Sequence, residues 1–329
     1  MRKRRLGNTD MEITTIGFGA WAIGGGGWEF GWGPQDDQKS IDAIHKALDE
    51  GSNWIDTAAA YGLGHSEEVV ARALKGMAER PYVFSKCGLQ GDAQNNVNKN
   101  LKADFIREEI ENSLRRLQVE RIDMYQIHWP TEDIEEGWRV LADAQKAGKL
   151  RWIGVSNFDA SQLETIRKIA PVSSLQPPYS VLFPDVEKET LPYCQKNNIG
   201  VIVYSPMASG LLTGTWTHER LAKLPADDWR RTKSPHYQEP AFTWNIQLAQ
   251  LLKEIGNSHG RSAGEVAIAW TLRNPAVTAA IVGARSPEQI EGVIGAGDFE
   301  LNAADIARIE EHFAARAEDR LLQQQMASD

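Results

Sequence analysis

Four side chains that can exchange a proton stand at, or just after, the ends of short apolar runs in this sequence. Asp56, Lys86 and His128 each end such a run, and Tyr61 comes five residues after Asp56. A carboxylic acid, an amine, an imidazole and a phenol that meet at one place make a proton-transfer site. They meet if the runs are neighbouring strands whose carboxyl ends share one rim of a barrel.

Tyr61 is the candidate acid of this site. A free phenol has a pKa of about 10, which is high for proton exchange near neutral pH. We expect the Lys86 ammonium to lower the pKa of Tyr61, and Asp56 to hold that ammonium in an ion pair. A neutral His128 would orient a carbonyl oxygen, so the set predicts protonation of an oxygen as a hydride reaches the attached carbon. The competing interpretation is a structural salt bridge beside a packed Tyr and His, and only the joint placement of the four argues against it.

Strand-like and helix-like segments alternate along the chain and would position these residues. The expected strands cover residues 16–21, 53–56, 82–86, 122–128, 151–155, 173–176, 199–204 and 278–282. Short apolar strands that alternate with helices are typical of a parallel sheet buried on both faces. The pattern predicts an α/β fold, a (β/α)8 or TIM barrel, with an N-terminal β-hairpin within residues 4–14 and a C-terminal helix. We expect one domain over residues 1–329, with a core of about 4–313 and a tail of 314–329.

The main alternative fold is an open doubly wound sheet. It is disfavoured because no Gly-x-Gly-x-x-Gly turn joins a strand to a helix. Two long connections, residues 89–102 and 206–240, leave the carboxyl ends of expected strands. Connections of this length are often lids or binding loops, although an unstructured surface excursion is the other interpretation.

Composition narrows the classes of function. The 329 residues are 42% hydrophobic, which suits a sizeable core, and the net charge of −9 disfavours nonspecific binding to nucleic acid or to an anionic membrane. The two cysteines give neither a disulfide framework nor a zinc spacing, and we expect no metal site. The basic N-terminus lacks the apolar stretch of a signal peptide and no run approaches a membrane span, so a cytoplasmic location is expected.

Seven stretches, taken in order, resemble the aldo-keto reductase family from about Arg4 to Phe313. They cover residues 17–21, 56–62, 85–87, 125–129, 154–158, 204–214 and 281–289. The branch that they resemble holds the bacterial general-stress and inositol-operon reductases and the potassium-channel β-subunits. The resemblance implies a TIM barrel that binds NADPH (as NADP+ after reaction), with NADH also open. It also implies the same four residues, with Tyr61 as the acid.

The resemblance further implies where the cofactor lies. Ser156, Asn157 and Gln176 would hold the nicotinamide carboxamide, and Tyr204 would stack on the nicotinamide ring. The other expected cofactor-binding residues are Ser205, Met207, Ser209 and Leu211 along the pyrophosphate, and Gly283, Arg285 and Gln289 at the adenosine end. A guanidinium such as Arg285 suits the 2′-phosphate of NADPH because it binds phosphate with parallel hydrogen bonds.

Two departures from the family pattern bear on the cofactor. Thr215 stands where the channel-type relatives have a phosphate-reaching Lys, and Arg230 or Arg231 would have to supply that charge. Gly292 and Val293 stand where relatives often carry Glu and Asn near the adenosine. These positions leave the preference between NADPH and NADH open.

The resulting hypothesis is an NADP(H)-dependent reduction of aldehydes or ketones to alcohols. The substrate would lie against aromatic walls made by Trp21, Trp28, Trp32 and Trp129. Two alternatives remain: a nicotinamide-binding regulatory subunit, and a sugar or inositol dehydrogenase that uses NAD. The expected partner is a small carbonyl or alcohol, and assembly into a homo-oligomer stays open.

Overall fold

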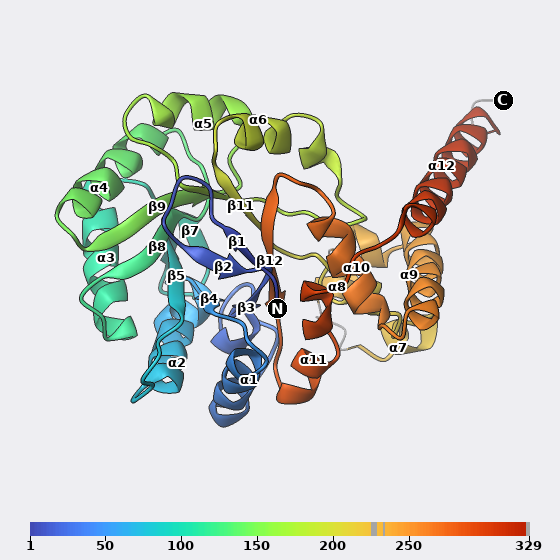
Figure 1. The fold of residues 1–329 in the computed structure, drawn as a ribbon, viewed down its shortest axis with the longest axis horizontal. Helices are drawn as coiled ribbons and strands as arrows, with labels where there is room; N and C mark the ends of the chain where they lie inside the picture. Colours follow the sequence, from blue (N-terminus) through green and yellow to red (C-terminus); the bar gives the residue numbers. More distant parts are fainter. Residues whose placement is uncertain (225–228, 233, 327–329) are drawn as a thin grey trace.

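A closed barrel of eight parallel strands forms the centre of the computed structural model (Figure 1). Its strands are β3 (Ile16–Gly19), β4 (Trp54–Asp56), β5 (Tyr82–Cys87), β8 (Ile122–Ile127), β9 (Leu150–Ser156), β10 (Ser174–Gln176), β11 (Gly200–Val203) and β12 (Val277–Gly283). They follow one another around the barrel in chain order, and β12 pairs with β3 to close it. The predicted TIM barrel is therefore confirmed, and the open sheet is wrong.

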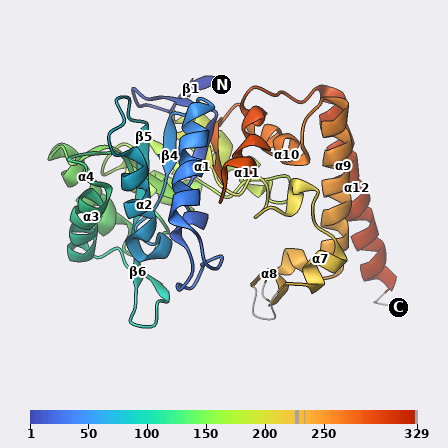
Figure 2. The same cartoon turned by 90° about the horizontal axis from the view of Figure 1, so that it is seen from below.

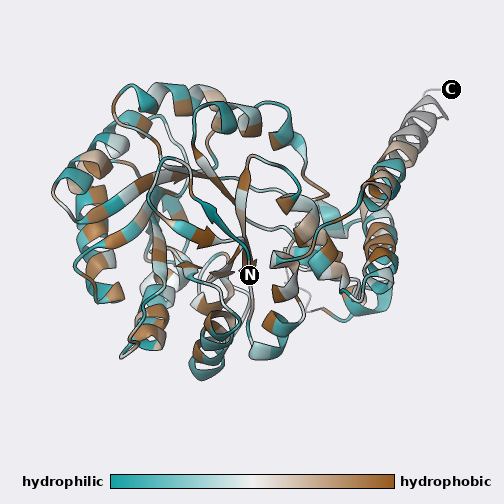
Figure 3. Ribbon diagram, viewed as in Figure 1, coloured by the Kyte–Doolittle hydropathy of each residue, from teal (hydrophilic) through white to brown (hydrophobic). Residues whose placement is uncertain are grey.

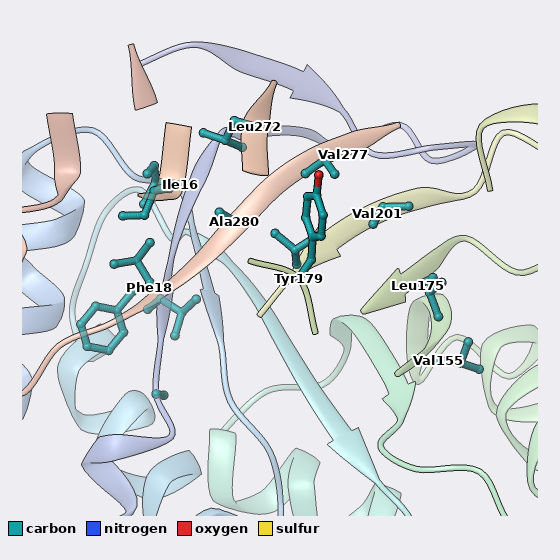
Figure 4. Close-up of a cluster of buried hydrophobic side chains, with 14 of the residues drawn as sticks. Ile16, Phe18, Val155, Leu175, Tyr179, Val201, Leu272, Val277 and Ala280 are labelled. Carbon is teal, nitrogen blue, oxygen red and sulfur yellow. The ribbon is translucent and has the colours of Figure 1, made fainter. Parts of the chain in front are cut away.

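Helices surround the barrel. They are α1 (Asp37–Asp49), α2 (His65–Leu74), α3 (Ala103–Leu117), α4 (Ile134–Lys146), α5 (Ala160–Arg167), α6 (Thr190–Lys196), α10 (Ala263–Leu272) and α11 (Pro287–Glu291). Asp159 before α5 and Ser262 before α10 each form a capping box, which satisfies amide groups that a helix start leaves free. Apolar residues line the inner sides of the helices (Figure 3), and Figure 4 shows strand residues such as Phe18 and Val201 in the core.

A second apolar cluster fills the inside of the barrel. Trp54, Phe84 and Met124 lie in it, together with residues of the hairpin β1 (Lys3–Arg5) and β2 (Glu12–Thr14). The hairpin was predicted, and it closes the barrel end from which the strands start. A Cβ on Gly17 would lie 2.1 Å from the Trp54 ring, so this indole occupies the space that a larger residue in β3 would need. The interior is therefore packed, as in other small barrels.

The long connections lie on the rim opposite the hairpin (Figure 2). The first contains an antiparallel pair that was not expected, β6 (Leu89–Gly91) and β7 (Val97–Lys99). The second contains the short helices η4 (Leu211–Thr213), α7 (His218–Ala222), α8 (Trp229–Thr232) and η5 (Pro235–Tyr237). The structure describes the backbone of residues 1–224, 229–232 and 234–326, and their side chains except at 229, 232 and 316–326.

Besides the short helices of the second connection, α9 (Ala241–Ser258) and α12 (Ala303–Met326) lie outside the eightfold repeat. α9 packs against α12, which runs away from the barrel toward the C-terminus (Figure 1). The predicted C-terminal helix is present and continues past residue 313 into the expected tail. None of the helices in the described residues is long and apolar enough to cross a membrane.

Candidate active site

The alternation of side chains along the strands explains why a polar site stands on an apolar interior. Successive residues of a strand face opposite sides, so residues two apart share a face. Trp54 and Phe84 fill the interior, and Asp56 and Lys86 follow them by two residues on β4 and β5. The ionisable pair therefore faces inward at the carboxyl end of the barrel, directly above the apolar layer.

Lys86 is the centre of the site. Its Nζ donates to Asp56 Oδ2 at 2.5 Å, to the Thr57 carbonyl at 2.9 Å and to the Tyr61 hydroxyl at 3.2 Å. On the other side of Asp56, Gln176 Nε2 donates to Oδ1 at 2.8 Å. The predicted group of Asp56, Lys86 and Tyr61 is thus assembled by direct contacts, and each charged atom of the pair has partners.

Tyr61 has a pKa that differs from our expectation. Burial, followed by the nearby Asp56 carboxylate, holds the pKa of Tyr61 well above its ordinary value. The expected lowering by Lys86 is wrong for this state of the protein. Burial penalises the charged phenolate, and Asp56, 2.5 Å from the Lys86 ammonium, offsets the attraction that we expected from Lys86. Tyr61 is consequently protonated at neutral pH, which suits a proton donor.

His128 lies beside the phenol. Its ring and the Tyr61 ring are 5.5 Å apart between centroids in an edge-to-face arrangement. Burial, with the Lys86 charge, lowers the pKa of His128 well below its ordinary value, so the imidazole is neutral. Its Nδ1 is buried and has no hydrogen-bond partner among the described residues. An unpaired buried nitrogen is costly, and it is typical of a site that receives a ligand.

The residues expected at the nicotinamide form one hydrogen-bond network. Ser156 Oγ donates to the Gln176 carbonyl at 2.7 Å, and Asn157 Nδ2 donates to the His128 carbonyl at 2.9 Å. The Tyr204 hydroxyl donates to Asn157 Oδ1 at 2.8 Å. The structure therefore brings these residues next to the proton-transfer group. Asn157 has a φ of 64°, a left-handed conformation that Asn tolerates better than most residues.

The chain after β11 is the segment expected at the pyrophosphate. Ser205 and Ser209 have positive φ angles of 55° and 56°, and Ala208 has 48°. Such strained backbone concentrates at ligand sites, because it can aim amide groups at an anion. Met207 is half-buried against the core, and Leu211 is fully buried within it. The side chain of Leu211 therefore packs in the core.

Arg285 is already engaged in this structure. Its guanidinium donates to Gln35 Oε1 at 2.6 Å, to the Pro34 carbonyl at 2.5 Å and to the Trp32 carbonyl at 3.2 Å. Its backbone amide donates to Gln289 Oε1 at 2.8 Å. Gly283, the last residue of β12, is exposed at the same rim. The adenosine-end residues are thus together, with Arg285 held by a loop that sequence reasoning did not connect to it.

Two of the four expected wall residues, Trp21 and Trp28, lie against Tyr61, and a third, Trp32, lies against Trp21. The Trp21 ring is 6.3 Å and the Trp28 ring 6.2 Å from the Tyr61 ring, and Trp32 is 5.6 Å from Trp21. Trp129 lies apart from this group: it is exposed, and the Lys99 ammonium of β7 sits 4.9 Å from its ring centroid. Residues 21–35, which we call the aromatic loop, therefore cover the phenol.

Arg220 is a candidate site residue that sequence reasoning missed. Its guanidinium donates to Thr215 Oγ1 at 2.5 Å and lies 4.3 Å from the Trp216 ring centroid. It thus brings a positive charge to Thr215, the position for which we expected Arg230 or Arg231 to supply one. Arg230 also stacks on Trp216, whereas Arg231 donates to the carbonyls of α7 and its following turn. The position of Arg220 five residues after Thr215 was the available signal.

The comparison with protein families decides the classification. The profile of the aldo/keto reductase family matches residues 15–314. The chain belongs to the aldo/keto reductase family. Members of this family act on small carbonyl compounds with nicotinamide cofactors.

Individual relatives cover almost the whole chain. Aldo-keto reductase YhdN of Bacillus subtilis is 38% identical over 93% of this chain and 91% of its own length. The NADH-specific methylglyoxal reductase of Escherichia coli is 35% identical over 94% of this chain and 98% of its own. The solved structure of the glycerol dehydrogenase AKR11B4 from Gluconobacter oxydans superposes with a TM-score of 0.86 at 37% identity, covering 95% of both chains.

Proposed function

We propose that this protein reduces aldehydes or ketones to alcohols with a reduced nicotinamide dinucleotide, and that Tyr61 donates the proton. The observation that carries the proposal is the 3.2 Å contact between the Tyr61 hydroxyl and the Lys86 ammonium, above a buried Lys86–Asp56 pair. A phenol that is protonated at neutral pH and is hydrogen-bonded to a second group that can carry a proton is a suitable general acid. The intact tetrad favours turnover over a purely regulatory subunit.

The residues of this chain fit a nicotinamide ring beside Tyr61. The buried His128 Nδ1, which has no partner among the described residues, supports a ligand at this site, and Ser156, Asn157 and Gln176 would supply hydroxyl and amide groups for a carboxamide. Tyr204 is tied to Asn157 and offers an aromatic face. The bound cofactor would supply the hydride. Trp21 and Trp28 would exclude water from the site and press the substrate toward the phenol.

The steps that belong to the protein concern the oxygen of the substrate. The neutral His128 ring would hold that oxygen by a hydrogen bond, and the Tyr61 hydroxyl would give it a proton as negative charge develops. Lys86 Nζ, at 3.2 Å from the phenol oxygen, would then stabilise the phenolate until it regains a proton. The reverse order of the same steps oxidises an alcohol.

Both NADPH and NADH are proposed as reductants. Arg285 and Arg220 offer guanidinium groups for phosphates, which favours NADPH. A relative with 35% identity carries the name NADH-specific methylglyoxal reductase, which supports NADH. The substrate class that fits the aromatic walls is a small aldehyde or ketone.

Replacement of Tyr61 tests the proposal. We expect Tyr61→Phe to lower kcat for carbonyl reduction by about 10²–10⁴-fold, the usual contribution of a general acid, while the Kd for NADPH and NADH changes little. Reduction is followed by the loss of nicotinamide absorbance, and binding by fluorescence titration. Tyr82→Phe is the matched control, because Tyr82 lies at the opposite end of β5 and should leave kcat unchanged. A Tyr61→Phe enzyme that keeps a tenth or more of its activity would contradict the role of Tyr61 as the proton donor.

Oxidation of polyols is a second candidate activity. It is favoured by the resemblance to a solved glycerol dehydrogenase, which has a TM-score of 0.86. It needs the same residues, with Tyr61 as the base. Initial rates with glycerol and sugar alcohols, measured with NADP+ and NAD+, would show which direction the site performs better.

A further inference from the structure

Arg285 acts as a latch on the aromatic loop. Its Nε and both terminal nitrogens donate to oxygens of residues 32–35, and Gln35 Nε2 returns a hydrogen bond to the Arg285 carbonyl at 3.0 Å. Gln35 therefore holds Arg285 at two points, the side chain and the backbone. Residues 250 positions apart in the chain are joined here, across the seam where β12 meets β3.

All of the oxygens that bind this guanidinium are neutral. No carboxylate lies within ion-pair distance of Arg285 among the residues that the structure describes. The guanidinium therefore keeps its full positive charge while its donors are occupied. Hydrogen bonds from a guanidinium to phosphate are roughly twice as strong as those to neutral acceptors, so an arriving phosphate can displace the loop. The displaced bonds nevertheless weaken the apparent affinity for that phosphate.

The latched segment is also part of the wall over Tyr61. Trp32, whose carbonyl accepts from Arg285, has its ring 5.6 Å from Trp21, and Trp21 faces Tyr61. The other side of the loop is fastened to the β6–β7 hairpin, where Asn95 Nδ2 donates to the Gly27 carbonyl at 2.8 Å. Release of Arg285 would therefore free one side of the cover and leave the other side attached.

We propose that Gln35 determines cofactor preference by competing with a nucleotide 2′-phosphate for Arg285, so that NADPH unlatches the aromatic loop and NADH leaves it latched. This inference rests on the proposed binding of nicotinamide dinucleotides. It makes Gln35 a specificity residue and the aromatic loop a sensor of the 2′-phosphate. The wall of the substrate site would then differ between the NADPH-bound and the NADH-bound enzyme.

The test compares two ligands that differ by the 2′-phosphate alone, adenosine 2′,5′-bisphosphate and adenosine 5′-monophosphate. By calorimetry we expect Gln35→Ala to bind the bisphosphate roughly 2- to 10-fold more tightly than the wild type, the worth of about one neutral hydrogen bond. Its affinity for the monophosphate should stay the same. Gln38→Ala is the matched control, because the Gln38 side chain contacts Asp42 on α1 and leaves Arg285 untouched. Arg285→Gln should abolish the difference between the two ligands.

Hydrogen exchange of the intact protein gives a second readout. The bisphosphate should speed exchange in residues 31–35 of the wild type, and the monophosphate should not. The inference is overturned if Gln35→Ala weakens bisphosphate binding, since Gln35 would then position Arg285 for the phosphate, or if it changes both affinities equally. It is also overturned if residues 31–35 stay protected with the bisphosphate bound. Failure of NADH and NADPH alike to bind any variant would overturn the proposed function as well, whereas dinucleotide binding with an unchanged Gln35→Ala overturns this inference alone.

Discussion

At the scale of single residues, burial affects the protonation states of the site residues more than any single neighbouring charge does. Lys86 and Asp56 are both fully buried, and the close pair satisfies each charge that desolvation would otherwise penalise. The pKa of Tyr61 is raised because burial, and then the nearby Asp56 carboxylate, disfavour the phenolate. His128 is neutral for a related reason, since burial and the Lys86 charge both disfavour the imidazolium.

The raised pKa of Tyr61 predicts opposite pH profiles for the two directions of the reaction. Reduction needs the protonated phenol, so its single-turnover rate should stay level from about pH 6 to about pH 9. Alcohol oxidation needs the phenolate, whose fraction rises about tenfold per pH unit below the pKa, so its rate should climb through the same range. Neutral His128 adds no inflection there. Stopped-flow nicotinamide absorbance measures both, and an oxidation rate that is highest near neutral pH would contradict the assignment.

At the scale of elements, two turns approach each other so closely that only glycines fit. Gly24 ends the short helix η1 (Ala22–Gly24), and Gly62 lies in η2 (Tyr61–Gly64) directly after the phenol. A Cβ on Gly24 would lie 2.7 Å from the Gly62 nitrogen and 2.9 Å from the Tyr61 carbonyl carbon. The aromatic loop therefore packs on the backbone of Tyr61, and the two glycines permit this contact.

Gly24→Ala should push the aromatic loop away from Tyr61. We expect a loss of about 1–3 kcal/mol in the free energy of unfolding, as for other overpacked sites, and a higher KM for the carbonyl substrate. Urea unfolding and steady-state kinetics at saturating reductant measure the two effects. Gly76→Ala is the control: Gly76 has a φ of 79° and open space around it, so it should lose stability through backbone strain without a change in KM. An unchanged KM in Gly24→Ala would show that the contact does not shape the substrate site.

At the scale of the whole molecule, a second buried polar cluster joins the barrel to α2 and α3. Glu67 accepts from Ser85 Oγ at 2.5 Å and from Arg116 Nε at 2.6 Å, and Glu109 accepts from the Gly88 amide at 2.7 Å. Burial, with the Glu67 charge adding to it, raises the pKa of Glu109 to about 8. The stability of the barrel should therefore depend on the pH through a group outside the tetrad.

Glu109 predicts that the protein becomes less stable as pH rises. The folded protein holds a proton on Glu109 up to about pH 8, whereas the unfolded chain releases it near its ordinary value of 4.5. The folded state therefore binds more protons between these values, and the free energy of unfolding should fall by up to about 1.4 kcal/mol per pH unit in that window. Glu109→Gln should flatten this slope, and the exposed neighbour in Glu108→Gln should not. Equal slopes for all three proteins in urea unfolding would rule out the effect.

The sequence by itself determined the barrel and the gathering of Asp56, Tyr61, Lys86 and His128 at one rim. Strand residues alternate faces, so Lys86 two places after Phe84 had to face inward above the apolar layer. Parallel strands end at one rim, and Asp56, His128 and Gln176 therefore had to gather there. These conclusions depend on local periodicity and on strand direction, which short stretches of sequence carry.

The tertiary structure alone decided the state of these residues and their distant partners. The pKa of Tyr61 depends on burial and on the 2.5 Å distance between Lys86 and Asp56, and residue order fixes neither. The hydrogen bonds between Gln35 and Arg285 join residues that are 250 positions apart, and the sequence offers many other residues that could pair with either side chain. The β6–β7 hairpin was hidden in a polar segment without alternation. Desolvation and contacts between distant residues depend on positions in space, so they can be deduced only from the folded barrel.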